Sequence, residues 1–180
     1  LTAFRALRFI DHALIEISTK MVKDESAAIR REVALAMRYI PAPQSKDILI
    51  EMIKRWDGKD RYYLEAFGYA SDNKTTEIYN AVKASTSWDE KMTMVAWRLH
   101  PVVSVKDLKK RALNSEINQL ERFRAIDGIA FCKSSIAYKA MRELKNKTTG
   151  KEKERCNYWF KHNSRASWKP YAGKQTFNYN

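Results

Sequence analysis

Glycine, proline and cysteine are scarce in this chain, and each shortage excludes a class of structure or site. Only 5 of the 180 residues are glycine and 4 are proline, which argues against a turn-rich all-β fold and favours long helices. The two cysteines, Cys132 and Cys156, form neither a CxxC nor a CxxCH motif. We therefore expect two isolated buried thiols rather than a zinc site or an attached haem.

Long apolar runs and catalytic motifs are also missing. No apolar run approaches the ~18 residues that a membrane span needs, and the start has no signal-peptide pattern. The chain opens on Leu1 without an initiator methionine, so we expect a fragment of a longer protein or a processed product. No Ser/His/Asp order, GxSxG, P-loop or HExxH occurs. We therefore expect no catalytic residue, metal site or cofactor in this segment.

What the sequence does contain is a repeat at intervals of 30 residues. Similar five-residue blocks align without gaps at 6–10, 36–40, 66–70 and 96–100, with weaker copies at 126–130 and 156–160. The first position of each block is small or apolar, as in Ala36 and Ala66, which suits a close approach of two helices. The fourth position is large, as in Tyr39 and Tyr69, and is expected to fill the layer between helices.

Each period also contains a second amphipathic stretch. Apolar residues recur at helical spacing around Ile48–Ile53 and at Ile78 and Val82, and turn-forming residues separate the stretches. One helix pair cannot bury its apolar face alone, whereas stacked pairs can. The sequence therefore predicts an all-α, HEAT-like α-solenoid of antiparallel helix pairs over residues 1–163. A basic, aromatic C-terminal extension at 164–180 is expected to pack as a cap.

One stretch, residues 55–68, differs from its counterparts because it combines aromatic and alternating charged residues. One interpretation is a recognition surface. The alternative is local: Asp57 turns the chain, Asp60 caps the next helix, as Asp89 does later, and Tyr62, Tyr63 and Phe67 enter the core. The candidate interaction surface comprises Trp56, Asp57, Lys59, Asp60, Arg61, Glu65 and Arg98.

The formal net charge is +13, which suits an acidic partner such as nucleic acid but also fits a protein with a basic surface. Basic residues recur at the repeat period as a predicted ladder, broken by Glu121, that consists of Arg31, Arg61, Lys91 and Lys151. A ladder could follow a polyanion, or its members could pair with nearby carboxylates. Residues 145–180 add basic side chains between aromatics, including Trp168, Phe177 and Tyr179, a pattern typical of single-strand binding as well as of a packed cap.

A HEAT-type DNA glycosylase is the third and weakest candidate function. Such enzymes use tryptophan and aspartate on a basic concave face, and the pairs Trp88–Asp89 and Trp56–Asp57 match that chemistry. Nothing else in the sequence matches that family.

Three segments, Asp57–Gly68, Ala96–Pro101 and Tyr158–Gly173, together resemble the HEAT-repeat region of large secreted bacterial proteins of the membrane-bound or sorbosone-dehydrogenase-like type. Those proteins join a β-propeller, a HEAT segment and a c-type cytochrome domain. The resemblance implies a periplasmic or otherwise extracytoplasmic location and a non-catalytic scaffold that contacts neighbouring domains or another protein. Any PQQ or haem c would then belong to other parts of the parent protein. Nucleic acid is the second choice of partner.

Overall fold

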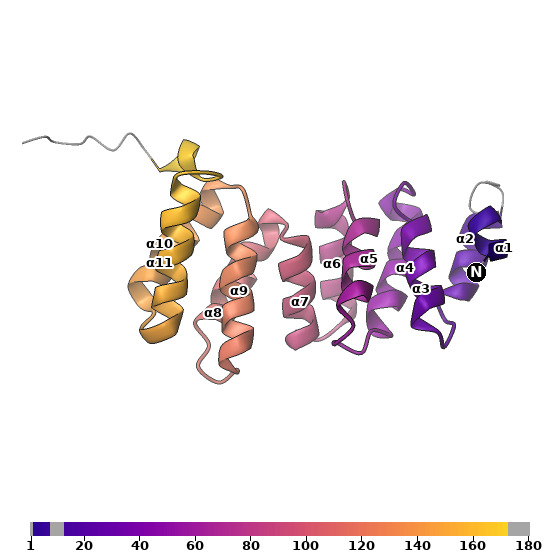
Figure 1. Ribbon diagram of the computed structural model, residues 1–180, viewed down its shortest axis with the longest axis horizontal. Helices are drawn as coiled ribbons and strands as arrows, with labels where there is room; N and C mark the ends of the chain where they lie inside the picture. The colour runs from indigo at the N-terminus through magenta and orange to yellow at the C-terminus, as the bar shows by residue number, and fades with distance from the viewer. Residues whose placement is uncertain (1, 8–12, 173–180) are drawn as a thin grey trace, which may run out of the picture. The chain divides into compact units, whose positions relative to one another are not determined.

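The computed structural model describes residues 2–7 and 13–172, and within them the chain is helical, without any strand (Figure 1). This confirms the predicted all-α class. None of the helices described is long and apolar enough to cross a membrane. The α-helices are α1 (Thr2–Leu7), α2 (Leu14–Met21), α3 (Ala27–Ala36), α4 (Ala42–Lys54), α5 (Arg61–Ala70), α6 (Thr75–Ser85), α7 (Glu90–Leu99), α8 (Val105–Ala112), α9 (Gln119–Phe131), α10 (Ser135–Lys147) and α11 (Gly150–Ser164), with 3₁₀ turns η2 (Val102–Ser104) and η3 (Lys169–Tyr171).

The chain forms two compact units, Leu1–Leu99 and His100–Asn180. In the first unit, α5 packs against α3 and α7 in one layer, and α4 packs against α2 and α6 in a second layer. In the second unit, α9 packs against α11 and α8 against α10, while α8–α9 and α10–α11 are the closest pairs. Each unit therefore buries its apolar residues between two layers of helices.

Two aspartates cap the starts of helices, at the positions that the sequence predicts. Asp60 accepts a hydrogen bond from the Tyr63 backbone N–H at the start of α5, and Asp89 accepts one from Met92 at the start of α7. Both bonds satisfy N–H groups that have no partner within the helix. The predicted caps at Asp60 and Asp89 are thus confirmed.

The buried faces agree with the predicted stripes in α4 and α6 but differ at three tyrosines. Ile48, Leu49, Met52 and Ile53 are buried in α4, as are Ile78 and Val82 in α6. By contrast Tyr39 is 84% exposed, Tyr62 78% and Tyr69 41%. The prediction that these tyrosines fill the core is therefore wrong. In α5 the buried stripe runs through Tyr63, Leu64 and Phe67, and Tyr62 and Tyr69 lie outside it.

The end of the described chain packs through one tryptophan. Helix α11 ends at Ser164, and Trp168 beyond it is fully buried, with its indole N–H donating to the Cys132 carbonyl at 2.8 Å. Phe177 and Tyr179 lie outside the described residues. Both cysteines are buried and unpaired, as predicted, and burial raises the pKa of the Cys132 thiol to about 12.

A buried lysine closes the end of α3. The Lys74 side-chain amine donates to the carbonyl of Met37 at 2.7 Å, to that of Ile40, and to the Ser45 hydroxyl at 3.0 Å. These carbonyls follow the last turn of α3, where backbone acceptors lack helical partners. Burial away from water lowers the pKa of Lys74 to about 8.

This lysine predicts a specific dependence of stability on pH. The unfolded chain holds the Lys74 proton up to an ordinary pKa of 10.5, whereas the folded chain releases it near 8. Because the unfolded state binds more protons between these two pH values, the free energy of unfolding contributed by this group rises with pH in that window. The raised pKa of Cys132 acts in the opposite direction above pH 9, so the test is the difference between two urea unfolding series: the stability of the wild type relative to Lys74→Met should rise across the window, because both proteins share the thiol contribution. Parallel curves for the two proteins would contradict it.

Candidate functional site

A surface groove in the first unit is lined mainly by α3 and α5 and contains charged and aromatic side chains. Its volume is about 540 Å³. Helix α1 adds Arg5 and α7 adds Arg98 to a lining that comes mainly from α3 and α5. The remaining lining residues are Ala28, Arg31, Glu32, Leu35, Tyr62, Glu65, Ala66 and Tyr69.

Ion pairs join both carboxylates that line this groove to arginine side chains. Glu65 accepts from Arg98 Nε at 2.6 Å through one oxygen and from Arg61 at 3.3 Å through the other. Glu32 accepts from Arg5 at 2.5 Å. The Arg61 and Arg5 side chains are 66% and 57% exposed, whereas Glu32 is only 14% exposed. Glu65 is 40% exposed, so charges of both signs are open to solvent in the groove, and the Arg5 and Arg61 guanidinium groups are the most exposed of these paired groups.

Gly68 creates the space that Arg98 occupies. A Cβ atom at position 68 would lie 2.2 Å from the Arg98 guanidinium carbon, far inside contact distance. The guanidinium thus lies directly over the α5 backbone and reaches Glu65, three residues earlier on the same helix. A larger side chain at position 68 would push Arg98 away and change the shape of the groove.

Another arginine, Arg38, lies against Tyr69, which lines the groove, and against Tyr39, which does not. The guanidinium carbon of Arg38 lies 3.7 Å from the centre of the Tyr69 ring and 5.6 Å from that of Tyr39. Arg38 also pairs with Asp72 at 2.5 Å. Stacking of a planar guanidinium on a ring restricts both side chains, so Tyr69 is held in place before any partner arrives.

The structure assigns local structural roles to several residues of the predicted interaction surface. Trp56 is only 2% exposed, and its indole N–H donates to the Asp60 carbonyl at 2.9 Å, so it belongs to the core. Asp57 accepts from the backbone N–H groups of Asp60 and Lys59, which lowers the pKa of its carboxyl. Gly58 beside it has φ +81°. The predicted Asp57–Gly58 turn is thus present.

The other predicted residues lie nearer the groove. Asp60 caps α5 and also pairs with Arg31 at 3.0 Å. Lys59 is exposed, and only its backbone N–H takes part in the turn. The groove itself therefore brings together Glu65, Arg98 and Arg31 from the predicted residues, with Arg61 paired to Glu65.

The members of the predicted basic ladder do different things. Arg31 is the fifth residue of α3, Arg61 the first of α5 and Lys91 the second of α7, so they are not equivalent on their helices. Lys91 donates to the Trp56 carbonyl at 2.6 Å. Lys151 belongs to the second unit, where it is exposed at the start of α11. In the first unit these positions serve mainly as structural contacts.

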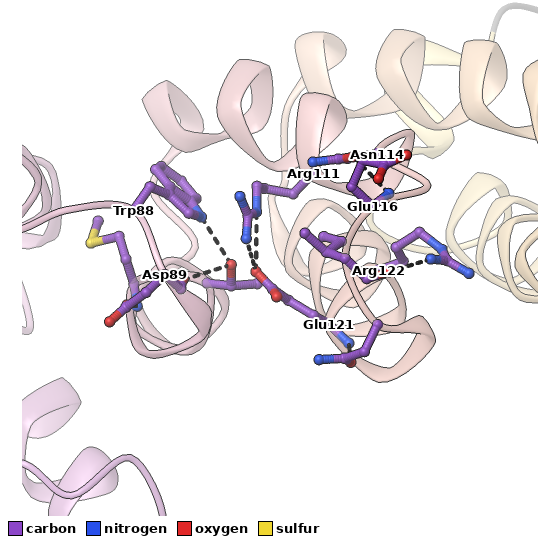
Figure 2. A network of polar contacts seen from close by, with 11 residues as sticks. Trp88, Asp89, Arg111, Asn114, Glu116, Glu121 and Arg122 are labelled. Carbon is purple, nitrogen blue, oxygen red and sulfur yellow. Dashed lines mark hydrogen bonds and ion pairs between the residues drawn. The ribbon is translucent and has the colours of Figure 1, made fainter.

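The tryptophan–aspartate pair considered for glycosylase chemistry is engaged locally. Figure 2 shows Trp88 beside the start of α7, where its indole N–H donates to the Thr93 hydroxyl at 2.9 Å. Asp89 caps the same helix through the Met92 N–H. In the second unit, Figure 2 shows Arg111 donating to Glu121, which is 4% exposed. Glu121, the residue that breaks the basic ladder, is thus a buried partner of Arg111.

Sequence reasoning missed several groove residues, namely Arg5, Glu32, Leu35, Tyr62 and Tyr69. The signal that could have found them is helical spacing. Tyr62, Glu65 and Tyr69 are three and then four residues apart and therefore share one face of α5. This face is distinct from the apolar stripe through Leu64 and Phe67.

Comparisons of the chain with protein-family models, with curated proteins and with solved structures found no match. Among the residues described, no three His, Cys, Asp or Glu side chains gather in a way that could hold a metal ion. Any function must therefore be inferred from the chain's own residues and geometry.

Proposed function

We propose that this chain is a non-catalytic, HEAT-like α-solenoid segment that binds a partner protein through the α3–α5 groove. The observation that carries the proposal is the groove itself, in which exposed tyrosines adjoin arginines already aligned by ion pairs. Tyrosine and arginine are enriched among residues that dominate binding energy at protein interfaces. The groove presents both residue types, with Tyr62 and Tyr69 from α5 and Arg31 from α3.

The spacing of the helices supports the solenoid part of the proposal. Helices α3, α5, α7, α9 and α11 start at residues 27, 61, 90, 119 and 150, which gives intervals of 34, 29, 29 and 31 residues. Helices α4, α6, α8 and α10 start at residues 42, 75, 105 and 135, at intervals of 33, 30 and 30. Such intervals are expected for helix pairs that repeat about every 30 residues.

Burial within the first unit also supports a repeat, with one change of register. Val33, Ala34 and Met37 are buried in or beside α3, and the residues 30 positions later, Tyr63, Leu64 and Phe67, are buried in α5. In α7 the corresponding set, Met92, Thr93 and Ala96, follows after 29 positions. These burial patterns support a repeat of about 30 residues that shortens by one between α5 and α7.

The charges of the groove favour a partner segment that carries carboxylates beside apolar side chains. The exposed cations Arg5 and Arg61 would pair with the carboxylates. Tyr62 and Leu35, which is 37% exposed, would cover the apolar groups. Arg5 and Arg61 already pair with Glu32 and Glu65, so the preference for partner carboxylates rests on the greater exposure of the two guanidinium groups, at 57% and 66%.

The setting of the segment is a separate proposal that rests on the resemblance alone. The block Asp57–Gly68 supports membership of a secreted dehydrogenase-like protein, and hence an extracytoplasmic location with neighbouring domains as partners. PQQ and haem c would then be bound elsewhere in that protein. A partner identified as a cytoplasmic protein would contradict this setting without affecting the groove.

A photoreactive side chain tests the groove in the cell that makes the protein. Benzoylphenylalanine in place of Tyr62 should cross-link to one protein or domain. The same group in place of Ile136, which is exposed in the second unit, should not capture that species. With the captured partner purified, the double variant Tyr62→Ala/Tyr69→Ala should weaken binding about thirty-fold, because two interface anchors are lost.

The control is Tyr39→Ala, which removes a tyrosine of the same unit that is 84% exposed and does not line the groove. Its affinity should stay close to that of the wild type. If the double variant binds as tightly as the wild type, or if Tyr39→Ala weakens binding as much, the groove is not the binding surface.

A further inference from the structure

The positive charge of the protein is concentrated in its second unit. Residues 1–99 contain 16 Lys and Arg against 14 Asp and Glu, a net charge of +2, whereas residues 100–180 contain 18 against 7, a net charge of +11. The formal total of +13 is therefore almost wholly a property of the second unit. A polyanion would be attracted to this unit rather than to the groove of the first.

Most acidic residues of the second unit are already paired and leave other bases uncompensated. Four of its seven carboxylates form ion pairs within the unit, namely Arg111–Glu121, Arg155–Asp127, Lys109–Glu143 and Arg122–Glu152. Exposed bases such as Lys161, Arg165 and Lys169 have no carboxylate within ion-pairing distance among the residues described.

These three bases line one pocket, which we call the basic aromatic pocket. It has a volume of about 400 Å³, and its walls are Tyr138, Phe160, Lys161, Ser164, Arg165, Lys169 and Ala172. The residues come from α10, α11, the turn after it and η3. No acidic residue lines the pocket, so its electrostatic potential is positive. Its volume lies in the range of small-ligand sites.

The apolar wall of the pocket is a pair of stacked rings. Tyr138 and Phe160 have ring centres 5.3 Å apart and an interplanar angle of 29°. Two further cations lie over them: the Arg142 guanidinium is 5.9 Å from the centre of Tyr138, and the Lys145 amine is 4.8 Å from that of Phe160. Five cations thus lie around the two stacked rings.

Buried contacts fix the backbone that carries two of the three lining bases. Trp168 is fully buried, bonds to the Cys132 carbonyl and meets Tyr138 edge-on at 6.2 Å. Its backbone N–H donates to the Asn163 carbonyl at 2.7 Å, and the Asn163 side chain donates to the Ala130 carbonyl at 2.6 Å. The segment between residues 163 and 168, and η3 after it, are therefore held in place without a ligand, which reduces the ordering cost of binding.

One polar atom beside the pocket has no partner. The Ser164 hydroxyl oxygen is buried and makes no hydrogen bond with any described residue, although Ser164 lines the pocket. Buried hydroxyls are normally hydrogen-bonded, so Ser164 adds an unused hydrogen-bonding group to the described lining of the pocket.

We propose that the basic aromatic pocket binds single-stranded nucleic acid, with a base against Tyr138 and Phe160 and the flanking phosphates on Lys161, Arg165 and Lys169. Aromatic surfaces next to a basic track are how proteins bind single strands without sequence preference. A duplex keeps its bases stacked and paired, so it could use the cations but not the aromatic wall. An anionic membrane likewise offers phosphates without bases.

Fluorescence anisotropy with a labelled oligothymidylate of about twelve nucleotides tests the proposal on the whole chain. Binding should weaken steeply as salt is raised from about 50 to about 200 mM. The triple variant Lys161→Ala/Arg165→Ala/Lys169→Ala should lower the affinity by about ten-fold or more and reduce the slope of log affinity against log salt by about 2, since three phosphate contacts are lost.

The matched control removes the same charge from exposed bases of the same unit that do not line the pocket. The variant Lys106→Ala/Lys110→Ala/Lys153→Ala should bind within about two-fold of the wild type, because its loss acts only through screened long-range attraction. Tyr138→Leu keeps an apolar side chain without the ring. It should weaken single-strand binding and leave the salt slope unchanged, since no phosphate contact is removed.

Four results would overturn the proposal. Equal losses in the two triple variants would mean that only net charge matters. Equal affinity for a duplex of the same length would mean that the aromatic wall does not contribute to binding. The same conclusion would follow if phosphatidylserine vesicles bound as tightly as the oligonucleotide and Tyr138→Leu had no effect on either. Binding of thymidine monophosphate as tight as that of the oligonucleotide would identify a free nucleotide, rather than a strand, as the ligand.

Discussion

Replacing Trp56 by alanine is expected to lower the free energy of unfolding by about 3–5 kcal/mol, the usual cost of emptying a buried aromatic site. Trp56 is 2% exposed, its indole N–H bonds to the Asp60 carbonyl, and its own carbonyl accepts from Lys91. The indole thus fastens the end of α4 to the cap of α5. Urea unfolding followed by circular dichroism measures the loss.

Two further variants help to interpret the loss of stability in Trp56→Ala. Trp56→Phe keeps a ring and loses the indole N–H, so it should cost about 1–3 kcal/mol for the lost hydrogen bond and the smaller ring; the Asp60 carbonyl keeps its bond from the Leu64 N–H. Tyr62→Ala removes an aromatic side chain that is 78% exposed and should stay within about 0.5 kcal/mol of the wild type. If Trp56→Ala were as mild as Tyr62→Ala, Trp56 would not belong to the core.

The Trp168→Ala substitution should cost a similar amount, about 3–5 kcal/mol, and act on the second unit. Trp168 is fully buried against Tyr138 and loses both that contact and its bond to the Cys132 carbonyl. Because it anchors η3, the variant should also bind oligothymidylate more weakly even under conditions where it remains folded. Thermal unfolding and hydrogen exchange of residues 135–164 measure the loss of stability.

Tyr171→Ala is the control for this second substitution. Tyr171 lies in the same 3₁₀ turn but is 39% exposed, and its hydroxyl makes only a long 3.4 Å contact with the Lys133 carbonyl. Its removal should change stability by about 0.5 kcal/mol or less. Comparable losses in the two variants would show that the turn as a whole, rather than the buried indole, stabilises the unit.

Much of the helical architecture was predictable because its signals are local. The caps Asp60 and Asp89 and the apolar stripes of α4 and α6 depend on residues within one or two turns of each other. Propensity and periodicity act over that range. The helical class and these local features therefore followed from the residues alone.

The orientation of aromatic residues at helix ends was not predictable in the same way. Trp56 continues the buried stripe of α4, four residues after Met52, although it lies beyond the helix end at Lys54. Its contacts with Asp60 and with Lys91, 35 residues away, are what the local sequence does not indicate. The local interpretation of residues 55–68 places Tyr62 in the core, but Tyr62 lies one residue before the buried stripe that begins at Tyr63. A composition of alternating charges and rings cannot by itself distinguish a side chain that fills the interior from one that faces solvent.

The candidate sites depended still more on distant pairings. Arg98 reaches Glu65 across the space left by Gly68. The residues that neighbour Arg98 or Glu65 in the sequence do not indicate this contact. The basic aromatic pocket likewise joins Tyr138 to Lys161 and Lys169. Only the folded chain brings such residues together, so the sequence could indicate that the tail was basic and aromatic but not where a ligand would lie.

Lys74 and Lys91 have a consequence for how such a chain can gain or lose repeats. Lys74 completes the end of α3 by bonding to Met37 and Ile40, and Lys91 bonds to the carbonyl that follows α4. In both cases the donor belongs to a later helix pair than the acceptor. A duplication or deletion that separated Lys91 from Trp56 would remove the side-chain bond to the Trp56 carbonyl. One that separated Lys74 from α3 would leave the Met37 and Ile40 carbonyls only their bonds from the Ile40 N–H and the Ser45 hydroxyl. An exchange of helix pairs is therefore expected to keep each lysine together with its acceptor.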